Sequence, residues 1–220
     1  MPAETTLKSN APSKYLSEVA RKVLHMCSFL IVLFIYFTDK ITACLVIGVL
    51  LLLLFIGNTL ILSSRFKILN DIKVKYFSFL LRDNEKDGYI SSNWFLLGCF
   101  LCVFLFPKYA AMSAITVLIF GDAFAALIGM KFGKHKFKNG KSLEGTLGFT
   151  AVSFLCVAAF MIFPETGNRF IAAAAASVPI AAIAELYSKQ IKIDDNLTIP
   201  LTFGFSMAVF LFIFEKAALF

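Results

Sequence analysis

Motifs that identify the common soluble enzymes are missing from this 220-residue chain. It has no GxSxG, no HExxH and no dinucleotide-binding glycine fingerprint, which argues against an α/β-hydrolase, a zincin-type metalloprotease and a Rossmann enzyme. The stretch NGKSLEG, residues 139–145, ends like a phosphate-binding P-loop, but position 135, where that motif needs glycine, is His. No strand is expected before it either, so a Walker A motif is excluded.

Charged residues are also scarce, at 16% of the chain, whereas hydrophobic residues make up 59% and the mean hydropathy is +0.82. A soluble domain is nearer 45–50% apolar, so the composition indicates a membrane protein. A net charge of +7 can indicate a protein that binds nucleic acid or anionic lipid. Here the cations lie between apolar runs, so membrane topology explains them and no nucleic-acid partner is expected.

Cysteine is limited to five residues, an odd number, and all five lie in apolar runs. A disulfide framework is therefore not expected. Cys99 and Cys102 form a CxxC pair, but no second pair and no His lies nearby, so packing is a better explanation than metal binding.

Seven apolar segments can be distinguished, and a membrane-spanning helix needs about 20 residues. They predict an all-α, polytopic membrane helix bundle with about seven transmembrane helices. The third segment is the weakest, because only residues 94–106 are strongly apolar. The segments are 19–37, 41–62, 93–109, 110–130, 146–163, 170–187 and 199–215.

The distribution of Lys and Arg predicts the orientation of the bundle. Seventeen of the 21 fall in the N-terminal tail and in the segments 63–92, 131–145 and 188–198, which are therefore placed inside. The four on the other side are Lys40, Lys108, Arg169 and Lys216. The N-terminus is thus predicted inside and the C-terminus outside, with residues 1–18 a cytoplasmic tail without a signal peptide and 19–220 a single transmembrane catalytic domain.

The long inside loop, 63–92, carries apolar residues at helical spacing with lysines between them. This pattern predicts an amphipathic helix lying on the inner leaflet. A solvated linker is the alternative.

Polar groups of unusual placement gather near the predicted inside face. Asp122 interrupts the fourth apolar segment, one to two turns from its inside end. For comparison, an ionised Asp at the centre of a span costs roughly 2.5–3.5 kcal/mol of insertion free energy. The other such residues are Arg21, Lys22, His25, Glu185, Asp194, Asp195 and Asn196. Carboxylate oxygens suit Mg²⁺, and the lysines of the loop after Asp122 suit a polyphosphate.

Each of these residues also has a structural interpretation. Glu185 can pair with Lys189 one turn later, and the Asp-Asp-Asn run can simply cap the last span. Arg21 and Lys22 can be topology anchors, His25 a packed core residue, and the GxxxG of Gly129 and Gly133 a helix contact. Their position on the same side of the membrane favours a shared site.

Five blocks of sequence resemble a known family. They are RKVLH (21–25), LLRDNEKDGYISSNWFLLG (80–98), GDAFAALIGMKFGKHK (121–136), KSLEGTLGF (141–149) and AELYSKQIKIDDNLTIPL (184–201). They occur in the order seen in dolichol kinase, phytol kinase and the CTP-dependent diacylglycerol kinases. The third and fourth blocks are also similar to phosphatidate cytidylyltransferases, but the longer carboxy-terminal signature of those enzymes is missing, which favours the kinases.

The resemblance implies transfer of the γ-phosphoryl group of CTP to a lipid alcohol such as diacylglycerol, a polyprenol (dolichol) or phytol, with Mg²⁺ as cofactor. The general base remains open between Asp194 and His25. The implied catalytic residues are Asp122, Asp194, Asp195, Arg21, Lys22 and His25. The implied nucleotide-binding residues are Gly121, Gly129, Lys134, Lys136, Lys141, Ser142, Glu144, Gly145, Lys189 and Asn196. The implied metal ligands are Asp122, Glu185 and Asp195.

Two other functions are weighed against the kinase. A phosphatidate cytidylyltransferase also uses CTP and Mg²⁺ but releases pyrophosphate. A small ion-coupled transporter, with Asp122 and Glu185 on the ion path, fits less well because the polar groups crowd one face and no internal repeat is seen. The kinase would be a multi-pass protein of the bacterial inner membrane or endoplasmic reticulum, with its active site on the cytoplasmic side, and a homo-oligomer is possible.

Overall fold

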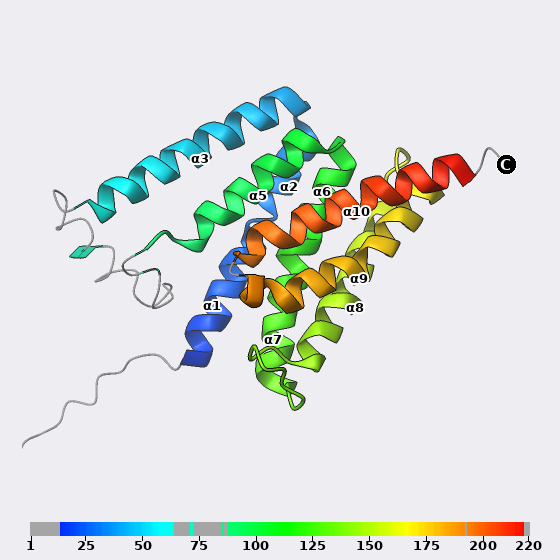
Figure 1. The fold of residues 1–220 in the computed structure, drawn as a ribbon. Coiled ribbons are helices and arrows are strands. Elements are labelled where there is room, and N and C mark those ends of the chain that lie inside the picture. Colours follow the sequence, from blue (N-terminus) through cyan, green and yellow to red (C-terminus); the bar gives the residue numbers. More distant parts are fainter. Residues whose placement is uncertain (1–13, 64–70, 73–84, 86–87, 192, 218–220) are drawn as a thin grey trace, which may run out of the picture.

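The computed structural model describes residues 14–63, 71–72, 85, 88–191 and 193–217 (Figure 1). The described residues form helices joined by turns, and the predicted all-α membrane bundle is confirmed. The α-helices are α1 (Lys14–Cys27), α2 (Leu30–Phe37), α3 (Lys40–Leu62), α5 (Ser91–Leu105), α6 (Lys108–Thr116), α7 (Asp122–Phe132), α8 (Leu143–Ala159), α9 (Asn168–Ile191) and α10 (Asp195–Ala217). Two short helical turns, η3 (Val117–Gly121) and η4 (Phe160–Ile162), continue α6 and α8.

Within these described ranges, six helical stretches are long and apolar enough to cross a membrane. They are Tyr15–Phe37, Lys40–Leu62, Lys108–Phe132, Leu143–Ile162, Asn168–Ile191 and Asp195–Lys216. The weak third segment forms α5, which has 15 residues and is short for a span. The count of seven and the orientation stay predictions. The predicted amphipathic helix falls almost entirely outside the described residues.

The stretch Lys108–Phe132, which corresponds to the fourth apolar segment of the sequence, runs through the middle of the bundle and is its most buried part. It comprises α6, η3 and α7; in Figure 1 α8 and α9 lie to one side of it, and α10 runs across it. Nearly every side chain from Ala110 to Ala123 is buried, including Ile115, Leu118 and Ile119. The segment that leads to Asp122 is therefore fixed by packing on all sides.

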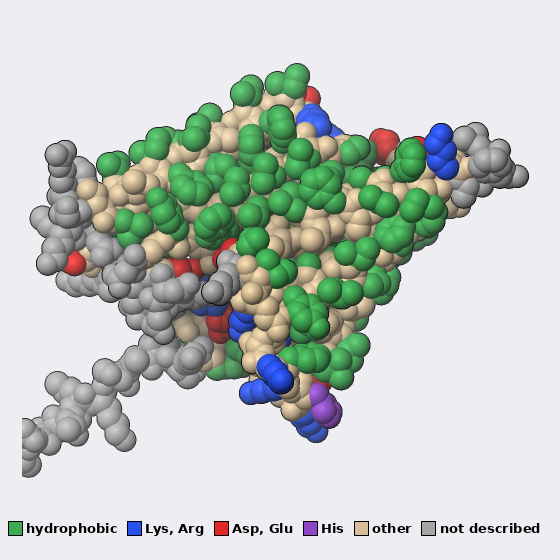
Figure 2. Space-filling model, in the orientation of Figure 1, with side chains coloured by type: hydrophobic (Ala, Val, Ile, Leu, Met, Phe, Trp, Pro, Cys, Tyr) green, Lys and Arg blue, Asp and Glu red, His purple; other side chains and the backbone are tan. Residues whose placement is uncertain are grey.

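The remaining helices pack around this centre. Helix α9 turns buried small residues such as Ala173, Ala174 and Ser177 toward its neighbours, which allows close approach to α10 and α8. Helix α3 lies at the edge, where it packs against α5 and α2. Its other sides expose apolar side chains, as suits a helix that faces lipid (Figure 2).

The first span is interrupted between α1 and α2. Ser28 N donates to His25 O at 3.0 Å, and Ile31 N donates to Ser28 O at 2.9 Å. These bonds join residues three apart, so the chain tightens locally into a 3₁₀-type turn. The turn follows directly after His25.

Capping interactions satisfy backbone groups at the end of α2, the start of α3 and the end of α5. Asp39 accepts hydrogen bonds from Ile41 N and Thr42 N at the start of α3, and the hydrogen bonds from Thr42 hold the pKa of Asp39 below its usual range. Lys108 Nζ donates to Tyr36 O at 2.7 Å and to Thr38 O at 2.9 Å, where α2 ends. Lys40 Nζ donates to Phe106 O at 3.2 Å, at the end of α5. Cations at helix C-termini are favoured by the unpaired carbonyls.

Candidate functional site

The site is built around Asp122, the first residue of α7. The five residues before it, Val117–Gly121, form a π-helical turn, which inserts extra backbone into the buried span and often marks functional positions. Helix α7 continues to Phe132, ten residues beyond Asp122, or roughly 15 Å. The helix thus extends beyond the apolar run, and the depth of Asp122 relative to the inside end of the span stays a prediction.

Asp122 is 7% exposed and forms a buried ion pair with Lys22 of α1, which is 6% exposed. These two residues are 100 positions apart in the chain. A buried charge must be paired, and the contact of α1 with α7 supplies the partner. Two residues predicted to be catalytic are thus in direct contact.

His25 lies one turn after Lys22 on α1, close to the same pair. Its ring packs edge-on against Phe95 of α5, with centroids 5.1 Å apart. Its Nε2 is buried and has no hydrogen-bond partner among the described residues. A buried imidazole nitrogen without a protein partner is available to a ligand.

The connection between α7 and α8 folds into a tight hairpin. Phe137 N donates to Lys141 O at 2.8 Å, and Gly140 N donates to Phe137 O at 2.9 Å. Gly140 has φ +82°, a left-handed conformation that glycine adopts without steric cost. The hairpin brings Lys141 toward the ends of α9 and α10.

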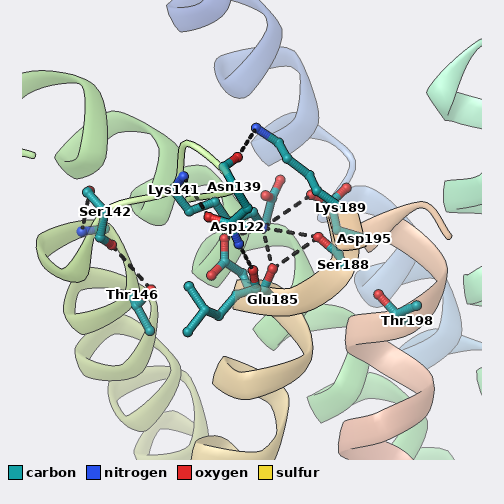
Figure 3. A network of polar contacts seen from close by, with 12 residues as sticks. Asp122, Asn139, Lys141, Ser142, Thr146, Glu185, Ser188, Lys189, Asp195 and Thr198 are labelled. Atoms are coloured by element: carbon teal, nitrogen blue, oxygen red, sulfur yellow. Dashed lines mark hydrogen bonds and ion pairs between the residues drawn. The ribbon is translucent and has the colours of Figure 1, made fainter. Parts of the chain in front are cut away.

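Lys141 is the centre of a polar network in which α8, α9 and α10 meet (Figure 3). Its Nζ lies 2.6 Å from Glu185 Oε1 and 3.9 Å from Asp195 Oδ2, and it donates to Ser188 Oγ at 3.2 Å. In Figure 3 Asp122, Glu185 and Asp195 gather around this lysine. Two predicted metal ligands, Glu185 and Asp195, therefore lie beside one predicted phosphate ligand, Lys141.

The rest of the hairpin is tied to α9 and α8. Asn139 Nδ2 donates to Leu186 O at 2.6 Å, and Lys189 Nζ reaches Asn139 O at 3.5 Å. His135 Nδ1 lies 2.7 Å from Glu144 Oε1. These contacts hold the backbone of the hairpin, and they engage Glu144 and Lys189 within the protein.

The other predicted nucleotide-binding residues of this region have different positions. Lys134 and Lys136 are exposed on the outside of the hairpin. Ser142 caps α8 by accepting a hydrogen bond from Gly145 N at 3.1 Å. A Cβ on Gly145 would lie 2.8 Å from Ala125 O and one on Gly129 would lie 3.0 Å from Ser142 Oγ, so both glycines let α7 approach α8. Gly121 packs in the same way against Phe149.

The start of α10 carries the last three predicted residues. Asp194 Oδ1 accepts hydrogen bonds from Asn196 N at 3.0 Å and from Asn196 Nδ2 at 2.8 Å, so it caps the helix. This leaves Asp195 in the first turn with its carboxylate toward Lys141. In the Asp-Asp-Asn run, Asp194 thus has the structural role of a helix cap, whereas the carboxylate of Asp195 is directed to the polar network of Lys141.

An apolar cavity of about 530 Å³ lies beside the Lys22–Asp122 pair, and we call it the acceptor cavity. Its walls come mainly from α1, α3 and α5, and His25, Asn58 and Asp122 all line it. Leu24 and Leu53, which also line it, are exposed on the lipid-facing sides of α1 and α3. The cavity therefore connects the buried carboxylate with the apolar surface of the bundle.

A second, more polar cavity of about 870 Å³ lies next to the first, and we call it the polar cavity. Arg21 lines both cavities and is paired with Glu18. The polar cavity is lined further by Trp94, Ser188, Lys189, Asp194 and Asp195. Arg21 thus separates an apolar space from a space bordered by cations, carboxylates and one indole ring.

The expected magnesium site can be compared with the positions of the carboxylates. Glu185 Oε2 is buried without a hydrogen-bond partner among the described residues, and Asp195 stands on the other side of Lys141. In the described ranges no three metal-type side chains stand close enough to bind an ion alone. A Mg²⁺ ion here would therefore need further ligands besides these carboxylates, such as waters and substrate phosphates.

Four residues of these sites were missed by the sequence reasoning. Asn139 and Ser188 contact Lys141 or its hairpin, and their sequence signal is weak. Asn58 is the one amide in the otherwise apolar 41–62 segment, and Trp94 is the one tryptophan of the chain. A polar residue inside a predicted span is a signal for function or packing that could have identified Asn58.

Comparisons with known proteins identify relatives of this chain. A protein of Rickettsia prowazekii that has no described function is 31% identical over 204 residues, 89% of this chain and 96% of the relative. The CTP-dependent diacylglycerol kinase 1 of Schizosaccharomyces pombe is 29% identical over 55% of this chain and 60% of the kinase. The phytol kinase of a Synechocystis strain is 36% identical over 51% of this chain and 48% of the kinase.

The match therefore spans about half the length of the kinases. No family model and no solved structure matches the chain significantly. Similar curated proteins also include a dolichol kinase. By these relationships the chain belongs to the family of lipid-alcohol kinases that contains CTP-dependent diacylglycerol kinase, phytol kinase and dolichol kinase.

Proposed function

We propose that this protein is a CTP-dependent lipid kinase, which transfers the γ-phosphoryl group of CTP to the hydroxyl group of a membrane lipid alcohol. The observation that carries the proposal is the meeting of two unlike cavities at Arg21, beside the Lys22–Asp122 pair. A lipid alcohol needs an apolar space that opens toward lipid, and a nucleotide needs a polar space. The family relationship supports the same reaction.

The lipid alcohol occupies the acceptor cavity. Its chain passes between α1 and α3 to the exposed sides of Leu24 and Leu53, and its hydroxyl group reaches the depth of Asp122. A volume of about 530 Å³ is typical of a small-molecule site and suits the polar end of a lipid with the first part of its chain. The remainder of the chain stays in the bilayer.

The nucleotide occupies the polar cavity. Trp94 offers a flat face on which a cytosine base can stack. Arg21, Lys141 and Lys189 supply cationic donors for the phosphates, since phosphoryl transfer depends on positioning and on neutralising the charge of the oxygens. Lys134 and Lys136 can add to this on the exposed hairpin.

The carboxylates that would hold Mg²⁺, one or two of them together with substrate phosphates, belong to the set of Asp195, Glu185 and Asp122. When bound, the ion neutralises charge on the phosphate oxygens and keeps the leaving group in line. Glu185 contributes its unpartnered Oε2, and Asp195 faces the polar cavity. Asp122 also keeps the ammonium of Lys22 at the boundary of the two cavities.

In the reaction, the lipid oxygen forms a bond to the γ-phosphorus while the bond from the γ-phosphorus to the β,γ-bridging oxygen breaks. His25 Nε2 accepts the hydroxyl proton, and CDP leaves with the electron pair of the broken bond. His25 suits this role better than Asp194, because His25 lines the acceptor cavity and its Nε2 has no partner among the described residues, whereas Asp194 caps α10.

The test uses purified full-length protein in mixed micelles with a panel of lipid alcohols and CTP labelled at the γ-phosphate. The expected products are labelled phospholipid and unlabelled CDP, and a tenfold excess of unlabelled ATP should leave the labelling unchanged. Label in pyrophosphate and cytidine on the lipid, with phosphatidate as substrate, would establish the cytidylyltransferase instead. Labelling abolished by ATP would show that the donor is not specifically CTP.

A second experiment tests the assignment of the two cavities. Gly57 of α3 lines the acceptor cavity, and a Cβ there would meet nothing within 4 Å. Gly57→Leu should therefore fill part of the cavity without strain and raise the KM for the lipid alcohol, with the KM for CTP unchanged. Gly167→Leu, at a position that is equally open but lies between α8 and α9 on the other side, is the matched control. An equal rise in both KM values for Gly57→Leu would contradict the assignment.

A further inference from the structure

Glu18 is an acidic residue of the polar cavity that the proposed reaction leaves without a role. It belongs to α1 and forms an ion pair with Arg21, one turn further along the helix. The guanidinium of Arg21 contacts Oε2 of Glu18, and in the described part of the chain no hydrogen bond reaches Oε1. The side chain of Glu18 is 24% exposed, so a molecule in the cavity can reach its carboxylate.

The place of Glu18 follows from helical spacing along α1. Residues three or four positions apart share one face of a helix, and this face carries Glu18, Arg21, Lys22 and His25. Lys22 and His25 line the acceptor cavity, Arg21 lines both cavities, and Glu18 lines the polar cavity. Glu18 lies roughly 6 Å along the helix axis from Lys22, on the side away from His25. The face therefore leads from the position of the reacting hydroxyl group, past the phosphates, to Glu18.

A nucleoside triphosphate bound along this face brings its base toward Glu18. The base is the part of the nucleotide farthest from the γ-phosphorus, so it occupies the remainder of the polar cavity when the γ-phosphoryl group lies at the boundary beside Arg21. Glu18 and Trp94 both form part of the wall there. Stacking on an aromatic ring tolerates every base, whereas the edge of the base carries its identity. Trp94 can therefore hold a base, and Glu18 can distinguish one base from another.

The two other acidic side chains that line the polar cavity are engaged at the start of α10. Asp194 Oδ1 accepts two hydrogen bonds from Asn196, and the carboxylate of Asp195 is directed to Lys141. Glu18 differs from both, because its ion pair fixes the carboxylate through one oxygen and leaves the other oxygen for a donor. Among these three acids, Glu18 is thus the best acceptor for the edge of a base.

The two pyrimidine bases differ at the position that such an acceptor reads. Cytosine carries an amino group at C4, which donates hydrogen bonds, and a carboxylate is a good partner for it. Uracil carries a carbonyl oxygen at C4. A carboxylate that faces this oxygen would set two acceptors against each other without a proton between them, which disfavours binding of the wrong base.

We propose that Glu18 selects CTP over UTP by accepting a hydrogen bond from the C4 amino group of a cytosine base that stacks on Trp94. This inference rests on the proposed kinase function and assigns a specificity-determining residue to the same site. Arg21 orients the carboxylate through their ion pair, and its remaining N–H donors stay available to the phosphates. Glu18 takes no part in phosphoryl transfer itself.

The experiment measures kcat/KM for CTP and for UTP in the wild-type protein and in Glu18→Gln, with the lipid alcohol that gives the highest turnover in the panel. Wild-type protein should prefer CTP by at least about tenfold, because sites built to hydrogen-bond a substrate N–H group reject analogues that lack it. Glu18→Gln keeps the size of the side chain and adds an NH₂ group that can donate to the C4 oxygen of uracil. It should abolish or reverse the preference, with a lower kcat/KM for CTP and a higher one for UTP.

Glu215→Gln is the matched control, because Glu215 is an exposed carboxylate in the last turns of α10, whereas the polar cavity meets the first turn. It should keep the wild-type preference. Equal losses with both nucleotides in Glu18→Gln would show that Glu18 only positions Arg21 or holds the ribose, and would overturn the inference. Absence of a preference for CTP in the wild-type protein, or an unchanged preference in Glu18→Gln, would overturn it too, while leaving the kinase function intact. Phosphorylation with neither nucleotide would instead refute the proposed kinase function.

Discussion

The buried ion pair between Lys22 and Asp122 shows at the residue scale what a sequence can and cannot predict. An acid in an apolar run is conspicuous, and Asp122 was predicted for that reason. Lys22 was also predicted as a site residue, but its pairing with Asp122 was not, because the two residues are 100 positions apart and Lys22 also has the ordinary explanation of a topology anchor. A pairing across the fold becomes visible only when α1 is packed against α7.

The pair also changes what is expected from mutating Asp122. Asp122→Asn leaves the ammonium of Lys22 buried without a counter-charge, which typically costs about 3–5 kcal/mol of stability. We therefore expect this variant to lose both stability and activity. The double variant Lys22→Gln/Asp122→Asn, whose two amides can hydrogen-bond, should regain most of the stability and none of the activity. Thermal unfolding followed by circular dichroism, together with a turnover assay, separates the two effects; near-normal turnover in Asp122→Asn would refute a catalytic role.

Lys141 is the second residue at which the structure sharpens the sequence reasoning. Five lysines lie between residues 131 and 141, and their composition alone does not rank them. The hairpin places Lys141 between Glu185, Ser188 and Asp195 and leaves Lys134 and Lys136 exposed. The ranking therefore depends on the turn at Gly140 rather than on local sequence.

Replacing Lys141 by Met should lower kcat/KM for CTP by a factor of about 100 or more. A charge-assisted contact to a phosphate would be lost, and the carboxylates of Glu185 and Asp195 would be left without the cation between them. Lys138→Met is the matched control, because Lys138 belongs to the same hairpin but is exposed. It should change kcat/KM by less than about twofold. Steady-state kinetics with CTP as the varied substrate measure both, and similar losses in the two variants would mean that the hairpin acts through its general charge.

At the scale of the helices, the apolar pattern predicted most elements, and the irregular ones were missed. The break between α1 and α2 and the π-helical turn before Asp122 leave no mark in hydropathy, because their residues are as apolar as those around them. Both irregular turns lie beside the site, near His25 and Asp122. Lys40 and Lys108, which counted against the inside-positive pattern, cap the ends of α5 and α2.

The hairpin with Lys141 connects α7 to α8, so the distance between these two helices should affect activity. A Cβ on Gly145 would lie 2.8 Å from Ala125 O, a backbone atom that cannot move without moving α7. We expect Gly145→Ala to lower stability by about 1–3 kcal/mol, as overpacking usually does, and to reduce activity by displacing Lys141. Gly167→Ala, which has open space, should do neither. Unfolding midpoints and turnover numbers of the two variants decide this, and a Gly145→Ala protein with wild-type values would show that the helices can separate freely.

On the scale of the whole molecule, charge and packing point to the same arrangement. The polar network, both cavities and the hairpin lie toward one end of the bundle, the end that the cation count places inside. The rest of the visible surface of the bundle, including that of α3, carries many exposed apolar side chains (Figure 2). The cavities could not be predicted from the sequence, because they depend on how α1, α3 and α5 diverge rather than on the content of any one segment.

The orientation itself remains to be measured. Seventeen of 21 cations predict that the α7–α8 hairpin faces the cytoplasm and the α8–α9 connection the other side, because the membrane potential and anionic lipids retain Lys and Arg inside. In a background with all five cysteines replaced, Lys138→Cys should react with a membrane-impermeant maleimide only after the membrane is opened. Arg169→Cys, which is also exposed, should react in intact cells or vesicles of native orientation. The reverse labelling pattern would place Lys141 and the polar cavity on the side without CTP, so it would overturn both the topology and the proposed donor.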